Sequence, residues 1–268
     1  MGDHQVRDAP DLTVGAVTTA PCPNCGAVTA GRRYCGECGQ SRRNLDGSVW
    51  ALLRETLDEL LNLDGRMFRT LRRLAAQPGA VTADYLAGKR RQYTPPVRLY
   101  LASSAAFFLG FLLTRPVANA YYGLDPVGDV GSYTDVMSRV VIVMLPAAAI
   151  VLRVLYLRSR RSLLHHLIFS LHVGSAALLW ALLLMLAATG LRASWGHYSE
   201  APRWLPDFVF WLWLPGWAVF LGYAALALRR AYGSSLIGSI VRTLIAAAVL
   251  GWAFFVGVPR LMMLLAHA

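Results

Sequence analysis

The stretch SLLHHLIFSLHVGSAALLWALLLMLAATGL, residues 162–191, is the part of the sequence that decides the fold class. It contains no Asp or Glu, and it exceeds the roughly 20 apolar residues that a helix needs to cross a hydrocarbon core about 30 Å thick. A segment inside lipid must satisfy every backbone polar group internally, so this one has to be helical. Residues 162–191 therefore predict a membrane-spanning helix.

Four further apolar stretches of comparable character surround this segment. They are Val97 to about Asn119, about Val136 to Leu157, about Phe208 to Leu228, and about Leu236 to Leu265. The whole chain agrees with this pattern: 56% of its residues are hydrophobic and 15% are charged, whereas soluble domains have about 45–50% and about 25%. We predict an all-α polytopic membrane protein with about five transmembrane helices in residues 97–268.

Basic residues orient these helices. They crowd the gaps before the first span, between the second and third spans, and between the fourth and fifth spans. The residues concerned are Lys89, Arg90, Arg91, Arg98, Arg153, Arg158, Arg160, Arg161, Arg229 and Arg230. Because cytoplasmic loops carry an excess of Lys and Arg, we expect a cytoplasmic N-terminus and an extracytoplasmic C-terminus. The N-terminal residues lack the apolar core of a signal peptide, which agrees with this orientation.

The net charge of +11 also bears on the partners of the protein. Such a charge is compatible with nucleic-acid binding, but in a chain this apolar it favours loops that face anionic lipid headgroups. We therefore expect membrane lipids, and not nucleic acid, as partners. Lys89, Arg90 and Arg91 are the candidate anionic-lipid contact, each contributing about 1 kcal/mol at the bilayer surface. The alternative is a general anchor without a headgroup site.

All four cysteines lie in one short segment near the N-terminus. The pattern is Cys22-Pro-Asn-Cys25, nine intervening residues, then Cys35-Gly-Glu-Cys38. Two such pairs supply four thiolates for tetrahedral Zn²⁺. A module of about twenty residues cannot bury a core, so the metal must supply its folding energy. We predict a structural, non-catalytic zinc ribbon at residues 21–41. Redox use of the two pairs would need a βαβ scaffold, for which there is no pattern.

The remaining N-terminal residues fall into two parts. Residues 1–20 are polar and small, which predicts a flexible tail. In residues 42–96, apolar side chains recur at steps of three and four and are interrupted at Asp64-Gly65, which predicts cytoplasmic juxtamembrane amphipathic helices. Their basic second half either lies on the inner leaflet or packs against the spans or another subunit. The sequence is also compatible with an unknown protein partner that binds the ribbon or these helices, and with a homo-oligomer.

Three histidines stand out in the third expected span. His165 and His172 are seven residues apart and share one helix face, while His166 points elsewhere. One hypothesis is a metal, proton or ligand site inside the membrane. The other, which we favour, is hydrogen bonding between helices, with His165 and His166 reaching the surface beside Arg161.

The five expected spans contain no Asp or Glu, whereas ion-coupled transporters usually bury a carboxylate. The motifs of zinc peptidases, serine hydrolases, nucleotide triphosphatases and dinucleotide enzymes are also missing from the sequence. Our leading hypothesis is an integral membrane protein of unknown activity that serves as a non-enzymatic interaction or regulatory module. The alternatives are a transporter or channel for a small solute or lipid, and an intramembrane enzyme using His166 and His172.

Several short motifs occur in an order that resembles a known family. They are YCGECGQ at 34–40, RTL at 69–71, QPG at 77–79, GKR at 88–90 with Tyr93 and Pro96, and HLIFSLH at 166–172. The chain resembles, over about residues 20–175, a bacterial membrane family catalogued as a domain of unknown function, number three-six-six-seven. The resemblance implies a protein of the bacterial inner (cytoplasmic) membrane but no activity. The family pattern often has a glutamate where this chain has His165, so it assigns no role there.

Overall fold

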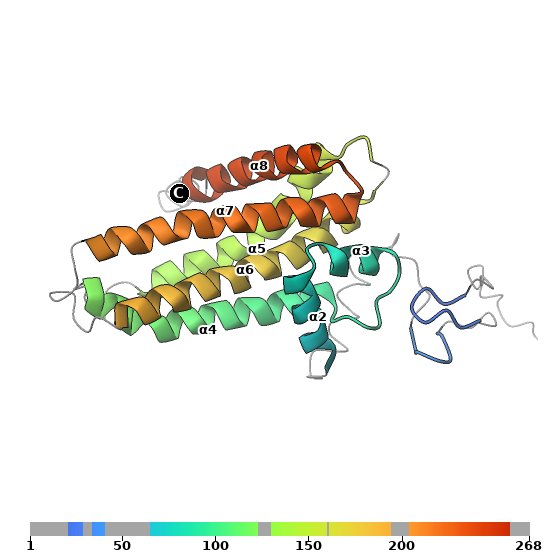
Figure 1. The fold of residues 1–268 in the computed structure, drawn as a ribbon, viewed down its shortest axis with the longest axis horizontal. Helices are drawn as coiled ribbons and strands as arrows, with labels where there is room; N and C mark the ends of the chain where they lie inside the picture. Colours follow the sequence, from blue (N-terminus) through green and yellow to red (C-terminus); the bar gives the residue numbers. More distant parts are fainter. Residues whose placement is uncertain are drawn as a thin grey trace, which may run out of the picture.

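The computed structural model describes residues 21–28, 34–40, 65–122, 130–159, 161–193 and 204–257. Its helices are α2 (Gly65–Ala76), α3 (Ala80–Leu86), α4 (Pro96–Tyr122), α5 (Val130–Leu155), α6 (Leu163–Ala193), α7 (Trp204–Tyr232) and α8 (Leu236–Trp252), followed by the π-helical turn η2 (Ala253–Gly257) (Figure 1). No strand occurs in these ranges, so the predicted all-α class is confirmed for the described part of the chain.

The five long helices α4–α8 run side by side (Figure 1). Helix α6 is central: it packs most extensively on α4 and also contacts α5 and α7, while α8 packs on α7 and α5. The helices begin and end within a few residues of four of the expected spans. The fifth, α8, ends at Trp252, and the predicted continuation to Leu265 runs past Gly257 into residues outside the described ranges.

Two helical segments in the described residues are long and apolar enough to cross a membrane. They are Pro96–Pro116 in α4 and Leu163–Leu191 in α6. Val141–Leu155 in α5 and Leu236–Trp252 in α8 are apolar but shorter. Length and composition thus single out two of the five expected spans, and the count of about five stays a prediction.

Two polar side chains of α4 find hydrogen-bond partners on the backbone. The Ser103 hydroxyl donates to the carbonyl of Leu99 one turn earlier, at 2.9 Å. The Tyr100 hydroxyl crosses from α4 to α5 and donates to the Val141 carbonyl at 2.8 Å. Such bonds remove the cost of burying a hydroxyl without a partner. They allow α4 to carry polar residues between helices.

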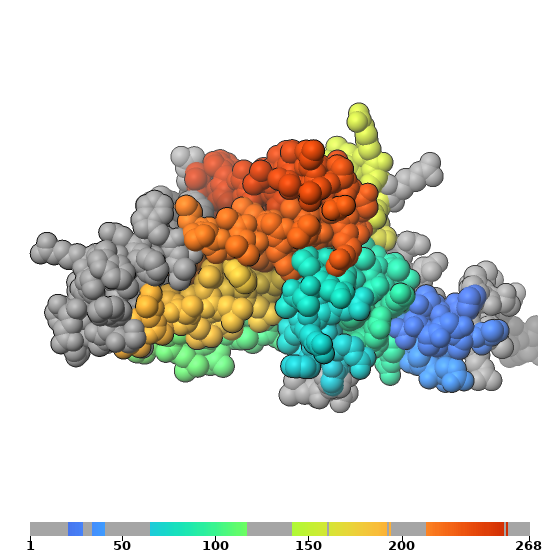
Figure 2. Space-filling model, in the orientation of Figure 1, coloured from blue at the N-terminus to red at the C-terminus, as the bar shows by residue number. Residues whose placement is uncertain are grey.

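Helices α2 and α3 cover one end of the bundle (Figure 2). Leu74 of α2 and Val81 of α3 are buried together with Leu99 at the start of α4, and Met67 and Leu71 pack against them. This apolar packing agrees with the second alternative for the basic amphipathic segment, packing against the spans.

Other predictions for the N-terminal region have different outcomes. Phe68 lies on α2 outside the packed stripe and is 74% exposed. The first half of the juxtamembrane segment, residues 42–64, and the expected flexible tail, residues 1–20, lie outside the described residues. The two predictions about those segments stay as predictions.

The turn between α2 and α3 approaches α7 unusually closely. Gly79 has a φ of 74°, and a Cβ atom there would stand 2.7 Å from the Cα atom of Ala227. Only glycine accepts both the left-handed backbone and this contact. Nearby, the Tyr223 hydroxyl of α7 donates to the carbonyl of Leu74 at 2.8 Å. Helix α7 therefore contacts two main-chain groups of this region, through its backbone at Gly79 and through the Tyr223 hydroxyl at Leu74.

Candidate functional site: a four-cysteine centre and its docking loop

The four cysteine thiols form a candidate metal centre. Their sulfur atoms all lie within 4.8 Å of one another. Cys22 Sγ is 3.7 Å from Cys38 Sγ, and Cys25 Sγ is 3.6 Å from Cys35 Sγ. A tetrahedron with metal–sulfur bonds near 2.3 Å has sulfur–sulfur edges of about 3.8 Å. The set therefore fits a tetrahedral metal ion, and its four thiolates would leave no coordination position open.

Both CxxC turns are built in the same way. The amide of Gly26 donates to the Cys22 carbonyl at 2.8 Å, and the amide of Gly39 donates to the Cys35 carbonyl at 2.9 Å. Both glycines have positive φ, 77° and 68°. The backbone amide of Cys38, and then that of its neighbour, lowers the pKa of the Cys35 thiol to about 7, because N–H groups aimed at sulfur stabilise the thiolate. The second turn thus favours the metal-binding form of the Cys35 thiol.

Gln40 joins this metal module, residues 21–28 and 34–40, to the loop that precedes α4. The Gln40 side chain is only 5% exposed. Its Nε2 donates to the Gly88 carbonyl, and its Oε1 accepts from the backbone amides of Arg90 and Arg91, both at 3.1 Å. A carboxamide is needed because one side chain must both donate and accept. We call residues 88–91 the docking loop.

Two further contacts support the same docking. Gly88 has a φ of 91°, and a Cβ atom there would meet the side chain of Pro23 at 3.1 Å. On the other side of the loop, the Arg91 guanidinium lies beside Gly39, 3.7 Å from where a Cβ atom would stand. Metal module and docking loop are therefore in contact on both sides of Gln40. In Figure 2 the metal module (blue) lies against the end of the molecule that carries α2 and α3.

Asp84 in α3 fixes the docking loop to the rest of the protein. It accepts a hydrogen bond from the Tyr93 hydroxyl at 2.6 Å and pairs with Arg73 of α2 at 2.9 Å. Lys89 of the loop approaches Asp84 to 3.7 Å. Burial of the phenol, and then its hydrogen bond to Asp84, raise the pKa of Tyr93. The loop is thus anchored to α2 and α3 by one carboxylate.

The three basic residues predicted to contact anionic lipid all belong to the docking loop. Lys89 faces Asp84, the Arg90 guanidinium lies 5.8 Å from the ring centroid of Tyr85, and Arg91 lies beside the metal module. Lys89 and Arg91 keep exposed side chains. The structure thus gives these residues protein neighbours, and the lipid contact stays a prediction.

Each of the three histidines of α6 pairs through Nδ1 with a different side chain. The Nδ1 pairs are His165 with Ser162 Oγ at 2.6 Å, His166 with Tyr232 Oη at 2.8 Å, and His172 with Thr82 Oγ1 at 3.0 Å. His166 and His172 are fully buried, and the Nε2 atom of each lacks a hydrogen-bond partner within the described residues. The two join α6 to α7 and to α3, respectively.

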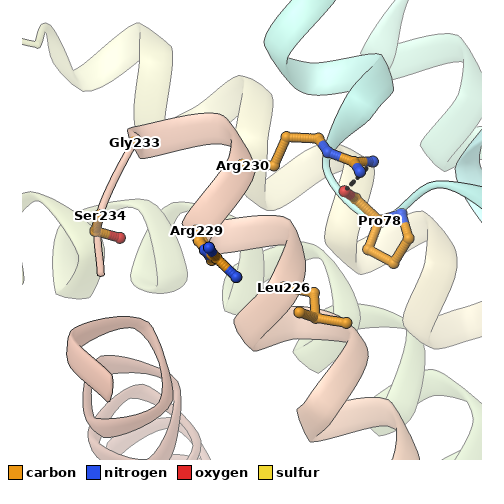
Figure 3. Close-up of a pocket in the computed structure, with 6 residues that line it drawn as sticks. All are labelled: Pro78, Leu226, Arg229, Arg230, Gly233 and Ser234. Carbon is orange, nitrogen blue, oxygen red and sulfur yellow. Dashed lines mark hydrogen bonds between the residues drawn. The ribbon is translucent and has the colours of Figure 1, made fainter. Parts of the chain in front are cut away.

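A hollow of about 580 Å³ lies beside the end of α7. Its lining consists of Pro78, Leu226, Arg229, Arg230, Gly233 and Ser234 (Figure 3). One Arg230 nitrogen donates to the Pro78 carbonyl at 3.1 Å across the hollow. Sequence reasoning used Arg229 and Arg230 only to orient the helices. The structure also makes Arg230 a tie between α7 and the α2–α3 turn.

Sequence reasoning missed Gln40, Thr82 and Tyr232. Gln40 stands two residues after Cys38, and this position was the available signal for its importance. Its partners are about fifty residues away, and those of Thr82 and Tyr232 are farther still. Neither spacing nor helical periodicity reports such long-range pairs.

Comparison with known proteins identifies one match. Residues 64–108 match the model of a family described as Protein of unknown function (DUF3667). This is the family indicated by the order of motifs, and the metal module lies outside the matched residues. The match includes α2, α3, the docking loop and the first half of α4. No curated protein and no solved structure matches the chain.

Proposed function

We propose that this chain, which carries the family segment at residues 64–108, is a multi-pass protein of the bacterial inner membrane whose zinc ribbon is a cytoplasmic interaction module. We take it to have about five transmembrane helices and a non-enzymatic or regulatory role. The observation that carries the proposal is the hydrogen bonding of Gln40 to the docking loop. These hydrogen bonds attach the metal module to the segment that leads into α4.

The outward side chains of the bundle support a membrane environment. Leu113 of α4, Ile142 of α5 and Ile237 of α8 are 69%, 65% and 76% exposed. Large apolar surface of this kind is costly in water and is accommodated by lipid. The basic residues Arg153, Arg158, Arg161, Arg229 and Arg230 all belong to helix ends or turns on the side of α2 and α3. The positive-inside bias makes that side cytoplasmic.

We assign zinc to the four-cysteine centre because soft thiolates in a tetrahedral set suit Zn²⁺. A complete shell of protein ligands leaves no site for substrate or water, so the ion supports folding instead of chemistry. Of the two alternatives, intramembrane catalysis rests on His166 and His172. Each of these side chains already bonds to a neighbouring helix.

Two exposed side chains of the metal module offer a surface for a protein partner. Val28 is 88% exposed and Tyr34 is 54% exposed. Tyrosine and apolar side chains are enriched where proteins bind one another. Because Gln40 fixes the module, these two residues are presented in a constant direction relative to the membrane.

Photo-crosslinking in cells tests the proposed interaction. A photoreactive residue at Val28 should give a discrete crosslinked product. The product should weaken when Gln40 is changed to Leu and disappear when Cys35 is changed to Ser. A photoreactive residue at Ile142, on the outward face of α5, is the control and should not give that product. The proposal would be contradicted if no product formed at Val28, or if its yield were the same in wild type and in both variants.

Cysteine labelling tests the orientation. A cysteine at Ser159 should resist an impermeant thiol reagent in intact cells, and a cysteine at Gly196 should react, because arginines concentrate beside the first position. The reverse pattern would place the metal module outside the cell.

A further inference from the structure

A stack of aromatic rings joins α5, α6 and α7 at the end of the bundle where α2 and α3 lie. Tyr156 and Tyr232 have ring centroids 4.4 Å apart with planes inclined by 25°. His166 stacks on Tyr232 at 5.5 Å with planes inclined by 19°. The Tyr232 hydroxyl is 2.8 Å from His166 Nδ1. The orientation of the imidazole is therefore fixed by both stacking and hydrogen bonding.

Arginines surround this stack. The Arg161 guanidinium lies 4.7 Å from the ring centroid of Tyr232 and donates to the Ala231 carbonyl at 2.8 Å. The Arg242 guanidinium, from α8, lies 4.6 Å from the ring centroid of Tyr156. Arg153, in the last turn of α5, lies three residues before Tyr156, whose ring centroid is 6.3 Å from that of His166. Helix α5, the α5–α6 connection and helix α8 thus each bring one positive charge to this place.

The positive charge has no counterpart in the described part of the chain. Among the described residues, Asp84 pairs with Arg73 and Lys89, and no ion pair is found for Arg153, Arg161 or Arg242. The first turns of α6 and α8 contain no acidic residue. The N-terminus of α6, three residues before His166, adds the positive end of a helix dipole.

Three polar atoms near this charge are buried without a hydrogen-bond partner in the described residues. They are Nη1 of Arg153, Nε2 of His166 and Oγ of Ser170. Ser170 lies one helical turn after His166, so the two side chains share a face of α6. When the Tyr232 hydroxyl donates to Nδ1, the ring hydrogen of His166 is on Nε2, which becomes a donor. Buried donors of this kind call for an acceptor.

We propose that Arg153, His166 and Ser170 form a binding site for a phosphate group. A phosphate offers several acceptor oxygens and negative charge, which match two unpaired N–H donors, a hydroxyl and the surrounding arginines. The Arg153 side chain is partly exposed, so the group can enter from outside the bundle. The phosphate belongs either to a lipid headgroup or to a soluble phosphate compound. A lipid source is compatible with the position, because a headgroup would lie at the first turn of α6.

The test uses the full-length protein in a neutral detergent, with its histidines labelled with ¹⁵N. Short-chain phosphatidylglycerol, inorganic phosphate and short-chain phosphatidylcholine are titrated separately. Binding should move the Nε2 resonance of His166 and raise the melting temperature. An effect of phosphatidylglycerol without one of inorganic phosphate identifies a lipid headgroup, and the opposite result identifies a soluble ligand. No shift with any of the three compounds overturns the proposal and leaves water as the partner.

Matched arginine variants separate a built site from general attraction. Arg153→Gln should weaken binding about tenfold or more, because it removes a charge-assisted hydrogen bond. Arg158→Gln, at an exposed position five residues later, should leave the affinity nearly unchanged. Equal losses in the two variants would overturn the proposal. If Arg153→Gln does not fold, Ser170→Ala provides the comparison, with a smaller loss expected at Ser170 and none at Arg158.

Discussion

The metal module and the α2–α3 pair lie at the same end of the bundle, but different interactions attach them to it. The module is held by the carboxamide of one side chain, Gln40, on three main-chain groups. The α2–α3 pair is held by burial of apolar residues such as Leu74 and by the close approach of Gly79 to α7. Hydrogen bonds fix direction and contribute modestly, whereas burial contributes most of the energy. The first attachment should therefore be easy to break without disturbing the second.

Loss of one cysteine should have the largest effect. Cys35→Ser leaves three thiolates, and the free energy of metal binding, about 10 kcal/mol or more in small zinc domains, can no longer support the fold of the module. We expect loss of about one zinc per chain by elemental analysis. The α4–α8 bundle should keep its melting temperature in detergent. Metal content unchanged from wild type, or iron in the wild type, would contradict the assignment.

A methyl group at Gly79 should weaken the attachment of the α2–α3 pair to α7. Gly79→Ala combines a left-handed backbone, costing about 1–2 kcal/mol, with a clash against the backbone of Ala227, costing about 1–3 kcal/mol. We expect about 3 kcal/mol of destabilisation at the α3–α7 contact, measured by unfolding in mixed micelles. Zinc content should not change.

Gly233→Ala is the matched control for Gly79. Gly233 has a similar φ of 67°, but a Cβ atom there would meet nothing within 4 Å. It should cost only the backbone term, about 1 kcal/mol. Equal losses at the two glycines would show that Gly79 does not approach α7 as described.

Breaking the docking contact should cost less. Gln40→Leu removes one donor and one acceptor and should cost about 2 kcal/mol of module–loop association, while the four thiolates keep their metal. Gln92→Leu, a change of the same kind just after the docking loop, should have no such effect. Zinc release that is accelerated in the first variant and unchanged in the second is the expected result. Equal release rates would argue against docking through Gln40.

The smallest effect is expected at Tyr223. Tyr223→Phe deletes the hydrogen bond to the Leu74 carbonyl but keeps the ring, so the loss should be about 1 kcal/mol. Unfolding in mixed micelles measures it. A loss as large as that of Gly79→Ala would mean that the hydroxyl, and not main-chain proximity, holds the turn to α7.

Local chemistry explains which features the sequence could predict. The spacing of Cys22, Cys25, Cys35 and Cys38 predicted the four-sulfur cluster, because each CxxC turn is a local structure. Apolar runs predicted the long helices within a few residues, since length and hydropathy are also local properties. The packed stripe of α2 was visible as a periodicity. Whether this stripe packs on lipid or on protein could not be predicted from the sequence, because both environments are apolar.

Contacts between distant residues could not be predicted in the same way. Thr82 bonds to His172 and Tyr232 to His166, pairs that only the packing of α3 and α7 on α6 brings together. Helical spacing alone put His165 and His172 on one face, yet the structure gives them different partners. The same limit applies to Gln40, whose role depends on where the docking loop lies.

Hydrogen exchange at the docking loop tests the central claim most directly. The amides of Arg90 and Arg91 donate to Gln40 Oε1, so in zinc-loaded wild-type protein they should exchange slowly. In Gln40→Leu, or after chelation of the metal, they should exchange faster, while the amides of α4 stay protected. Exchange at Arg90 and Arg91 that is equally fast in all three samples would contradict the account of a metal module fixed to the bundle.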